Sequence, residues 1–376
     1  MQFIDLKRQY DRVEADVRSR MHAVLRHQQF ILGPEVGELE RALAAYTGRK
    51  HVITCANGTD ALVMALMALE LEEMDAVFVP SFTFFASAEC VSLAGGTPVF
   101  VDCDPDTFNV CPDALEEAIK AVREQGRLKP RGVIPVDLFG LPADYSRILS
   151  IAKANGLFVL EDGAQGFGGI YDGKKVCSFG DIATTSFFPA KPLGCYGDGG
   201  AVFTDDDALA QRLLSIRVHG KGTDKYDNVR IGLNSRLDTL QAAVLLAKLN
   251  IFDDELAERN RVAATYTMAL EGVVKTPRVP KGSTSAWAQF TLTAKSHEQR
   301  EDLISGLKAQ GIPAMVYYPK PAHLSTAYKD LGYGEGSLPV CEELSRRVVS
   351  LPMHPYLTDA EIARVSAAVA ALCAGR

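Results

Sequence analysis

The chain has 376 residues, with 40 Lys and Arg residues against 47 Asp and Glu residues, so its formal net charge is −7. Hydrophobic residues make up 47% of the sequence and charged residues 23%, which is typical of a globular protein and excludes a disordered or fibrous chain. The acidic balance argues against a nucleic-acid coat and against adhesion to anionic membranes. At this length we expect two domains, or one large domain that carries a smaller one, because a single core rarely grows that large.

The distribution of charged residues and cysteines narrows the class further. The longest runs without a charged residue have 13 residues (76–88 and 282–294), whereas a membrane-spanning helix needs about 20. The N-terminal segment mixes acidic and basic residues where a signal peptide needs an apolar core, so we expect a cytoplasmic protein. Eight cysteines occur without a Cys-x-x-Cys pair, which predicts reduced, mostly buried thiols and no structural metal.

Short β-branched and aromatic runs in the first 204 residues predict buried strands. They lie at 51–55, 76–80, 97–102, 132–136, 157–162, 181–188 and 199–204. Helical patterns lie between several of these strands, at 59–70, 83–93, 113–124 and 145–154. Strand and helix in alternation predict an α/β fold with a largely parallel sheet, whose ligands bind beyond the carboxyl ends of the strands.

The second half of the chain has a different pattern. Its predicted elements are a long helical stretch at 235–270, a strand at 288–294, a helix at 297–310 and a short strand at 314–318. A closing helix opens on the capping box Thr358-x-x-Glu361 and ends at Gly375. These elements predict a smaller α+β domain. We place the boundary between residues 1–250, which include an N-terminal helix, and residues 251–376.

Two segments at predicted strand ends carry polar candidates. The first, Ala56–Asp60, follows a strand and opens a helix, where glycine allows close approach and first-turn N–H groups can seat a phosphate. The second ends in Glu161 and Asp162, which point to opposite faces of their strand, so one carboxylate can address a ligand at the strand end. Each segment alone is equally compatible with a helix cap or an ordinary turn.

A third segment, Thr185–Gly194, places Lys191 between apolar residues and two prolines. Desolvation lowers the pKa of a lysine and makes its amine a nucleophile suited to a Schiff base. The alternative is a surface lysine whose amine reaches water. Two glycine-rich segments, Gly168–Lys175 and Gly197–Gly200, lack the residues and the strand–helix setting of nucleotide-binding loops, so neither supports an NTPase or a dehydrogenase. The first of them is better explained as a hairpin turn.

Five ordered motifs, taken together, resemble one known family. They are ANGTDAL, PSFTFFAS, ED-x-AQ, SFFPAKPLG with GDGGAVF, and GLNSRLDTLQAA. In their order, and over nearly the whole chain, they are similar to the DegT/DnrJ/EryC1/StrS family of pyridoxal-phosphate-dependent sugar aminotransferases. The resemblance implies the aspartate aminotransferase fold (fold type I), with a large mixed, mostly parallel sheet domain and a smaller C-terminal α+β domain.

Carried over residue by residue, the resemblance implies roles around pyridoxal 5′-phosphate (PLP). Lys191 would form the internal aldimine and move the proton, Asp162 would keep the pyridine nitrogen protonated, and Phe84 would stack on the ring. Gln165 would contact the ring or its 3-oxygen. The residues that would hold the phosphate are Gly58, Thr59, Ser186 and, from the neighbouring subunit of a homodimer, Asn234.

The same resemblance implies the reaction. Family members that act as sugar dehydratases have histidine in place of the lysine, so Lys191 favours transamination, with L-glutamate as donor and pyridoxamine phosphate as the second form of the cofactor. The motifs look most like those of bacterial enzymes that aminate C3 of UDP-2-acetamido-2-deoxy-3-oxo-glucuronic acid for O-antigen lipopolysaccharide. The alternatives are a 4-keto or neutral 3-keto dTDP- or UDP-hexose acceptor, a non-catalytic sugar-nucleotide-binding member and, from the α/β pattern alone, a Rossmann-type oxidoreductase.

The prediction of how the substrate binds depends on one local excess of positive charge. In the segment 217–236, five basic residues stand against two Asp residues, a local charge of +3 that suits a diphosphate and a carboxylate. We expect Arg230 to bind the substrate carboxylate across the dimer interface; the alternative is a solvated loop near a helix C-terminus. A Tyr-Tyr-Pro-x-Pro-x-His segment resembles the family's substrate-facing loop and makes Tyr317, Tyr318 and His323 candidates, whereas His354 is equally well a structural residue.

Overall fold

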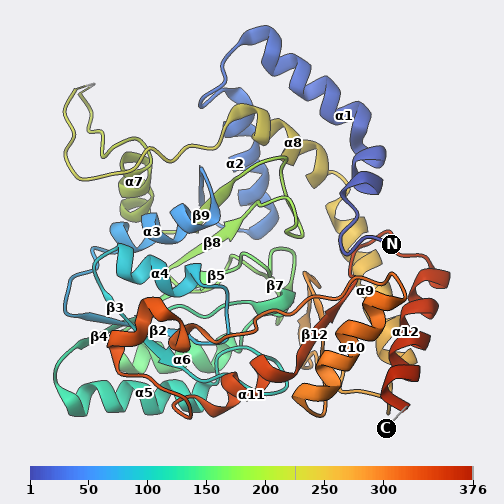
Figure 1. The fold of residues 1–376 in the computed structure, drawn as a ribbon. Coiled ribbons are helices and arrows are strands. Elements are labelled where there is room, and N and C mark those ends of the chain that lie inside the picture. The colour runs from blue at the N-terminus through green and yellow to red at the C-terminus, as the bar shows by residue number, and fades with distance from the viewer. Residues whose placement is uncertain (225, 375–376) are drawn as a thin grey trace.

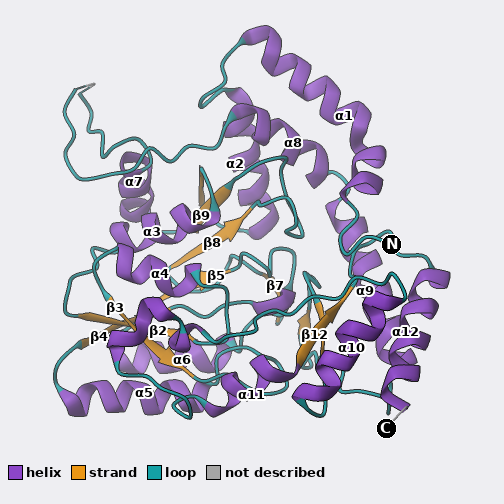
Figure 2. Ribbon diagram, in the orientation of Figure 1, coloured by secondary structure: helices purple, strands orange, loops and turns teal. Residues whose placement is uncertain are grey.

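The computed structural model describes residues 1–224 and 226–374 and shows one large sheet covered by helices, with a smaller body at the C-terminal end (Figures 1 and 2). Two features of the sequence, Lys225 of the basic segment and the predicted helix end at Gly375, lie outside the described residues. Within the described part of the chain, each helix is too short or too polar to cross a membrane.

Seven strands form the main sheet. They are β1 (His51–Cys55), β2 (Asp75–Pro80), β3 (Thr97–Val101), β4 (Lys129–Val133), β5 (Phe158–Asp162), β8 (Ile182–Ser186) and β9 (Gly200–Thr204). Their spatial order is β1-β9-β8-β5-β4-β2-β3, in which β9 runs antiparallel to both neighbours and the other pairs are parallel. The predicted α/β class is confirmed. Strand β4 begins three residues earlier than predicted, because its first residues are partly exposed and carry Lys129 and Arg131, which mask the hydrophobic pattern.

The main sheet is buried on both faces. Helices α3 (Gly58–Ala68), α4 (Ala86–Leu93) and α7 (Asp207–Ile216) pack on one face, and α5 (Pro112–Gln125) and α6 (Tyr145–Asn155) on the other. Strand β2 shows the division, since Val77 and Val79 belong to the first core while Ala76 and Phe78 belong to the second. Burial of both faces explains why these strands are visible in the sequence as continuous hydrophobic runs.

The predicted helical stretch at 235–270 is two helices, α8 (Thr239–Leu249) and α9 (Phe252–Ala269). The side chain of Asn250, between them, donates a hydrogen bond to Asp16 of α1 (Leu6–His27), and Phe252 on the far side of the break packs in the same core as Leu245 of α8. Helix α8 packs against α1 and α2 (Pro34–Thr47), whereas the later turns of α9 pack in the core of the C-terminal body.

The C-terminal body is built around a two-stranded antiparallel sheet. Its elements are β11 (Phe290–Thr293), β12 (Val348–Leu351), α10 (His297–Ala309), α11 (Pro339–Arg347) and α12 (Asp359–Ala374). The capping box of α12 is confirmed, because the Thr358 hydroxyl accepts from the N–H of Glu361 while the Glu361 carboxylate accepts from the N–H of Thr358. Helix α9 contributes to both this core and that of the main sheet, and the domain boundary at residue 250 stays a prediction.

Two predicted short elements have different outcomes. The predicted strand at 314–318 is wrong, because only Met315 pairs with β12 and the chain then turns its tyrosines toward the main sheet. The predicted hairpin is confirmed as β6 (Ile170–Tyr171) and β7 (Lys174–Lys175), which form a small sheet with β10 (Ser283–Thr284). Asp172 and Gly173 both have positive φ, as a two-residue hairpin turn requires.

Candidate active site

A cavity of about 510 Å³ lies where the ends of β5 and β8 meet the N-terminus of α3. The structure brings most of the sequence-predicted site residues to its wall. They are Gly58, Thr59, Phe84, Asp162, Gln165, Ser186, Lys191 and Tyr317. The N-terminal segment and the C-terminal body complete the wall with Ile4, Gln289 and Tyr318, so the cavity lies between the large sheet and the smaller body.

The first turn of α3 faces the end of β8. Asn57 caps the helix, because its Oδ1 accepts a hydrogen bond from the N–H of Asp60 at 2.8 Å. Gly58 lies so close to β8 that an added Cβ would stand 2.6 Å from the Cβ of Ser186. The N–H groups of Gly58 and Thr59 occupy a helix turn that offers them no intrahelical acceptor. With the Ser186 hydroxyl beside them, they form a seat suited to a phosphate.

Asp162 ends β5 with its carboxylate buried in the cavity wall. Its Oδ2 accepts a hydrogen bond from the Ser87 hydroxyl at 2.7 Å, and its Oδ1 accepts one from the N–H of Ala164 at 3.2 Å. Burial raises the pKa of Asp162, while these two hydrogen bonds and the nearby Lys191 oppose that rise. Glu161 points to the opposite face of β5, where its carboxyl group accepts from the N–H groups of Cys177 and Phe179. Only Asp162 therefore addresses the cavity.

Lys191 lies in the turn that follows β8. Its N–H donates to the carbonyl of Phe188 at 2.9 Å, and its partly buried side chain lines the cavity. Loss of hydration lowers the pKa of the Lys191 amine, and the Asp162 carboxylate partly restores it. A lowered pKa leaves more of the amine unprotonated near neutral pH, as a nucleophile and proton acceptor needs.

Both polar atoms of the Gln165 side-chain amide form hydrogen bonds. Its Oε1 accepts from the N–H of Phe139 at 2.8 Å, and its Nε2 donates to the Tyr318 hydroxyl at 3.0 Å. The Tyr318 ring lies 6.2 Å from that of Phe84, which is 54% exposed and presents an open aromatic face to the cavity. Tyr317 precedes Tyr318 through a cis peptide bond and also lines the wall.

Three predicted site residues do not line this cavity. Asn234 is exposed and lines a second cavity of about 370 Å³, which shares Asp198 with the first. Arg230 is exposed on the segment between α7 and α8, which projects from the body of the molecule (Figure 1). His323 is buried instead, with Nδ1 2.6 Å from the Ser81 hydroxyl and Nε2 3.2 Å from Glu342.

Two other residues named from the sequence have internal partners. Arg217, at the start of the basic segment, is buried and donates to the Glu40 carboxylate at 2.8 Å and to the carbonyl of Thr54 at 3.2 Å. His354 is also buried, and desolvation lowers its pKa to about 4. Because Arg217 is buried and paired with Glu40, the solvent-exposed positive charge of the 217–236 segment is smaller than its composition indicates.

The donor set of the cavity fits PLP. An amine, a buried carboxylate, an aromatic face and a phosphate seat are the groups that the ring, its nitrogen and its phosphate require. Gln289 adds a further sign of a ligand, because its buried Oε1 has no hydrogen-bond partner among the described residues. Sequence reasoning named Tyr318 as a candidate beside Tyr317 but missed Asn57, Ser87 and Gln289. Asn57 and Ser87 lie inside motifs already quoted, whereas Gln289 reaches the cavity only through the tertiary fold.

An α/β sheet that presents these groups at its strand ends defines a PLP-dependent aminotransferase. The pattern of the DegT/DnrJ/EryC1/StrS aminotransferase family matches residues 11–370, and the chain belongs to that family. It is 46% identical over 370 residues to the UDP-2-acetamido-2-deoxy-3-oxo-D-glucuronate aminotransferase of Pseudomonas aeruginosa, covering 98% of this chain and 99% of that protein. It is 44% identical over 360 residues to a pleiotropic regulatory protein of Geobacillus stearothermophilus, covering 95% of this chain and 94% of that protein.

Solved structures agree with this assignment. A DegT/DnrJ/EryC1/StrS aminotransferase from Brucella abortus is 52% identical and superposes with a TM-score of 0.97, with 100% of each chain covered. Other solved structures similar to this chain include forms with pyridoxamine phosphate and with PLP. The fold, the PLP dependence and the aminotransferase class expected from the sequence are thereby confirmed.

Proposed function

We propose that the protein transfers an amino group from L-glutamate to C3 of UDP-2-acetamido-2-deoxy-3-oxo-glucuronic acid, a step in bacterial O-antigen biosynthesis. The observation that carries the proposal is the single cavity in which the Lys191 amine and the buried Asp162 carboxylate meet beside the phosphate seat of Gly58. The Pseudomonas aeruginosa relative, similar over 98% of this chain, supports the choice of sugar.

Each cavity residue has a proposed task. PLP, when bound, supplies an electron sink for the charge left on a carbon that loses its proton. Asp162 would keep the ring nitrogen protonated, and Lys191 would link to the cofactor and then carry the proton between the reacting carbon of the substrate and the cofactor. Phe84 covers one ring face and Gln165 contacts the ring. The residues that hold the phosphate are Gly58, Thr59 and Ser186.

The second part of the proposal is a homodimer with shared sites. Asn234 and Arg230 lie on the exposed segment that projects between α7 and α8 (Figure 1). The same segment exposes Ile231 by 84% and Val229 by 54%, which is a large apolar area for a surface facing water. In a dimer, Asn234 would reach the partner's phosphate seat and Arg230 the carboxylate of the sugar, where a guanidinium binds bidentately. Tyr317 and His323 stay candidates for substrate binding, although His323 lies outside the cavity wall.

Absorption spectroscopy tests the catalytic part. Purified protein given PLP should gain a visible absorption band, L-glutamate should convert that band to the pyridoxamine form, and borohydride should fix the cofactor on Lys191. The Lys191→Ala variant should lose the covalent link and turnover, while Lys174→Ala, an exposed lysine on the β6–β7 hairpin, should keep both. A protein that stays colourless with PLP would overturn the proposal. Turnover of 4-keto sugars in preference to the 3-keto uronic acid would overturn the choice of acceptor.

Complementation tests the shared sites. Lys191→Ala and Asn234→Ala variants should each be inactive, yet a mixed dimer should regain activity, because one of its two sites then keeps both residues. If mixed dimers stay inactive, the shared site is wrong. The Arg230→Ala variant should raise KM for the uronic-acid sugar but not for a neutral 3-keto sugar, and the exposed Lys221→Ala variant on the same segment is its control.

A further inference from the structure

Two cysteines that are distant in the sequence meet where β3 ends and α11 begins. Cys103 lies two residues after β3, and Cys341 lies in the first turn of α11. Their sulfur atoms are 3.3 Å apart, and the side chains are 2% and 0% exposed. Asp102, next to Cys103, places a carboxylate oxygen within 4.8 Å of both sulfurs. This cluster lies outside the wall of the PLP cavity.

The carboxylate of Asp102 is held in place by backbone donors. Its Oδ1 accepts from the N–H of Cys341 at 2.8 Å, and its Oδ2 accepts from the N–H of Val340 at 3.0 Å. A carboxylate oxygen that accepts one or two N–H bonds retains acceptor capacity, and carboxylates that ligate a metal are themselves held by hydrogen bonds in this way. The N-terminal end of α11 also favours negative charge on the ligands beside it.

We propose that Asp102, Cys103 and Cys341 bind one thiophilic divalent cation of the zinc type, with water as its fourth ligand. Two sulfur ligands and one carboxylate select Zn²⁺ or Cd²⁺ over Mg²⁺ or Ca²⁺, which prefer oxygen alone. A tetrahedral Zn²⁺ with Zn–S bonds of about 2.3 Å separates its two sulfurs by about 3.8 Å. The thiols therefore need to move apart by only about half an ångström. Asp102 is only partly buried and gives the ion a path from solvent.

A cation bound here would lie between the two sulfurs and the Asp102 carboxylate, whose polar atoms are all within 4.8 Å of one another. Binding would release the two thiol protons to water, because cysteine ligates a metal as the thiolate.

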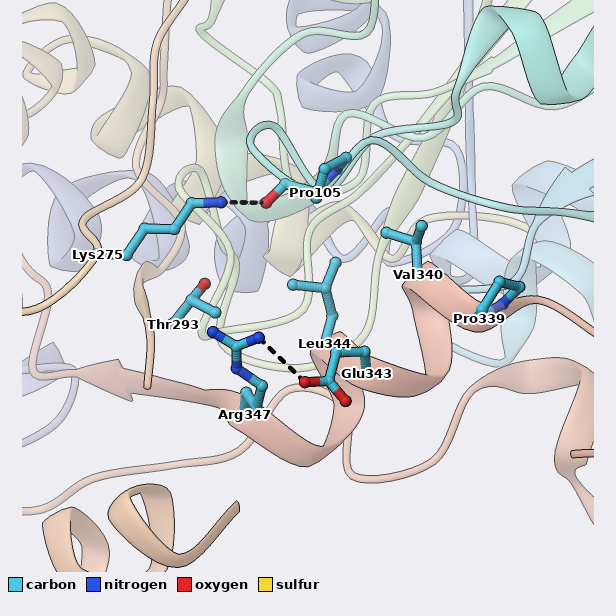
Figure 3. A pocket seen from close by; sticks show the side chains of 8 residues that line it. All are labelled: Pro105, Lys275, Thr293, Pro339, Val340, Glu343, Leu344 and Arg347. Carbon is cyan, nitrogen blue, oxygen red and sulfur yellow. Dashed lines mark hydrogen bonds and ion pairs between the residues drawn. The ribbon is translucent and has the colours of Figure 1, made fainter. Parts of the chain in front are cut away.

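A bound cation would join α11 to the large sheet beside the active site. Cys103, Cys341 and Leu344 belong to one apolar cluster that also packs against Tyr317 and Tyr318 of the cavity wall. Figure 3 shows a pocket beside α11 that is lined by Pro105, Val340 and the ion pair of Glu343 and Arg347. The cation would therefore stabilise the contact between the smaller body and the sheet.

Cadmium binding to the reduced, PLP-loaded protein tests the site. After chelator treatment and reduction, we expect about one Cd²⁺ per chain by elemental analysis, with an ultraviolet sulfur-to-cadmium absorption band and a higher thermal midpoint. The Cys103→Ser and Cys341→Ser variants should each weaken binding at least about tenfold and lose the rise in thermal midpoint. Cys111→Ser and Cys373→Ser, which lie outside the cluster, should bind Cd²⁺ as the unmodified protein does.

Two results would overturn the site. One is Cd²⁺ binding that the Cys341→Ser variant retains, which would place the ion elsewhere. The other is a reduced, unmodified protein that binds no Cd²⁺. Should the serine variants fail to fold, the number of thiolates on Cd²⁺ in the unmodified protein decides, because the proposal requires two sulfur ligands, and the ultraviolet band intensity reports that number.

Discussion

The hydroxyl of Ser87 donates a hydrogen bond to Oδ2 of Asp162 at 2.7 Å, inside the wall of the PLP cavity. The Ser87 hydroxyl also lies 3.0 Å from that of Thr83, so the serine belongs to a short chain of polar groups on α4 and the turn before it. Because Asp162 is buried, such donors oppose the rise in its pKa and favour the ionised carboxylate. Helix α4 thereby contributes to the proposed cofactor site.

The Ser87→Ala variant should lower kcat/KM by roughly 10- to 100-fold, since a hydrogen bond to a charged group contributes about 1.5–3 kcal/mol. Removing this donor raises the pKa of Asp162 further. The acidic limb of the pH–rate profile should therefore move to higher pH. Steady-state kinetics as a function of pH measures both effects.

The exposed Ser92 on the same helix provides the control. Ser92→Ala removes the same hydroxyl far from the carboxylate and should keep the unmodified kinetics and pH profile. Equal profiles for the two variants would contradict the role of Ser87.

The sequence predicted those parts of the site that lie within one continuous segment. Asp162 ends one buried strand and Lys191 follows another, and the chemistry of their neighbours is visible in the sequence itself. Gln289 could not be found in this way, because it reaches the cavity from the C-terminal body, 98 residues after Lys191 in the chain. Its side chain is unremarkable in the sequence pattern and acquires a role only through packing.

The elements of the fold divide in the same way into those that the local sequence predicts and those that depend on tertiary packing. Strands buried on both faces were predicted from hydrophobic runs, since burial alone determines their composition. The segment 314–318 has that composition without being a strand, because only Met315 finds a backbone partner there and the tyrosines that follow pack into the cavity wall. The break at Asn250 was missed because Leu245 and Phe252, on either side of it, are buried in the same core, so the hydrophobic pattern continues across the break.

The Gly58→Ala variant should weaken PLP binding by at least about tenfold. An added Cβ would lie 2.6 Å from the Cβ of Ser186, so either the helix start or the strand end must move, and both belong to the proposed phosphate seat. Equilibrium dialysis of PLP with the apoprotein measures the loss.

Gly37 in α2 is the matched control for this substitution. Its added Cβ would meet only the mobile end of Arg41, at 3.4 Å, and alanine favours a helix by about 0.5–1 kcal/mol. Gly37→Ala should therefore keep PLP affinity and raise the thermal midpoint. A Gly58→Ala variant that binds PLP normally would show that the close approach to Ser186 does not form the seat.

The buried carboxyl pair of Asp137 and Glu161 should make stability fall as pH rises. Burial raises the pKa of both groups, so the folded protein holds protons that the unfolded chain releases above about pH 4. The contribution of this pair to stability is then greatest below that value and is lost as the pH rises toward the raised folded-state values. Urea unfolding between about pH 5 and 8 measures the slope.

The Asp137→Asn variant should flatten this dependence. Oδ1 of Asp137 accepts from the N–H of Ala143 and the Tyr145 hydroxyl, whereas its buried Oδ2 has no hydrogen-bond partner among the described residues. An asparagine keeps the first oxygen and puts an amide donor in place of the second, so stability at about pH 8 should rise by about 1–2 kcal/mol. Exposed Glu117→Gln is the control and should leave the slope unchanged. If the Asp137→Asn variant kept the same slope of stability against pH, the burial of this carboxyl pair would not be the cause of that slope.

The final prediction separates two roles for His323. In the structure its buried ring joins Ser81, which follows β2, to Glu342 of α11, and it lies outside the cavity wall. Replacement by alanine leaves both partners without their hydrogen bonds, so His323→Ala should lower the free energy of unfolding by about 2–4 kcal/mol. KM for the sugar should change by less than about threefold, because a structural link does not touch the substrate.

Tyr317→Ala gives the opposite pattern and completes the test. Tyr317 lines the cavity and is only partly buried, so its loss should raise KM by about tenfold or more with a smaller effect on stability. Denaturant unfolding and steady-state kinetics on both variants distinguish the roles. If His323→Ala instead raised KM as strongly as Tyr317→Ala while stability held, the histidine would contact the substrate after a movement of α11 that the present arrangement does not show.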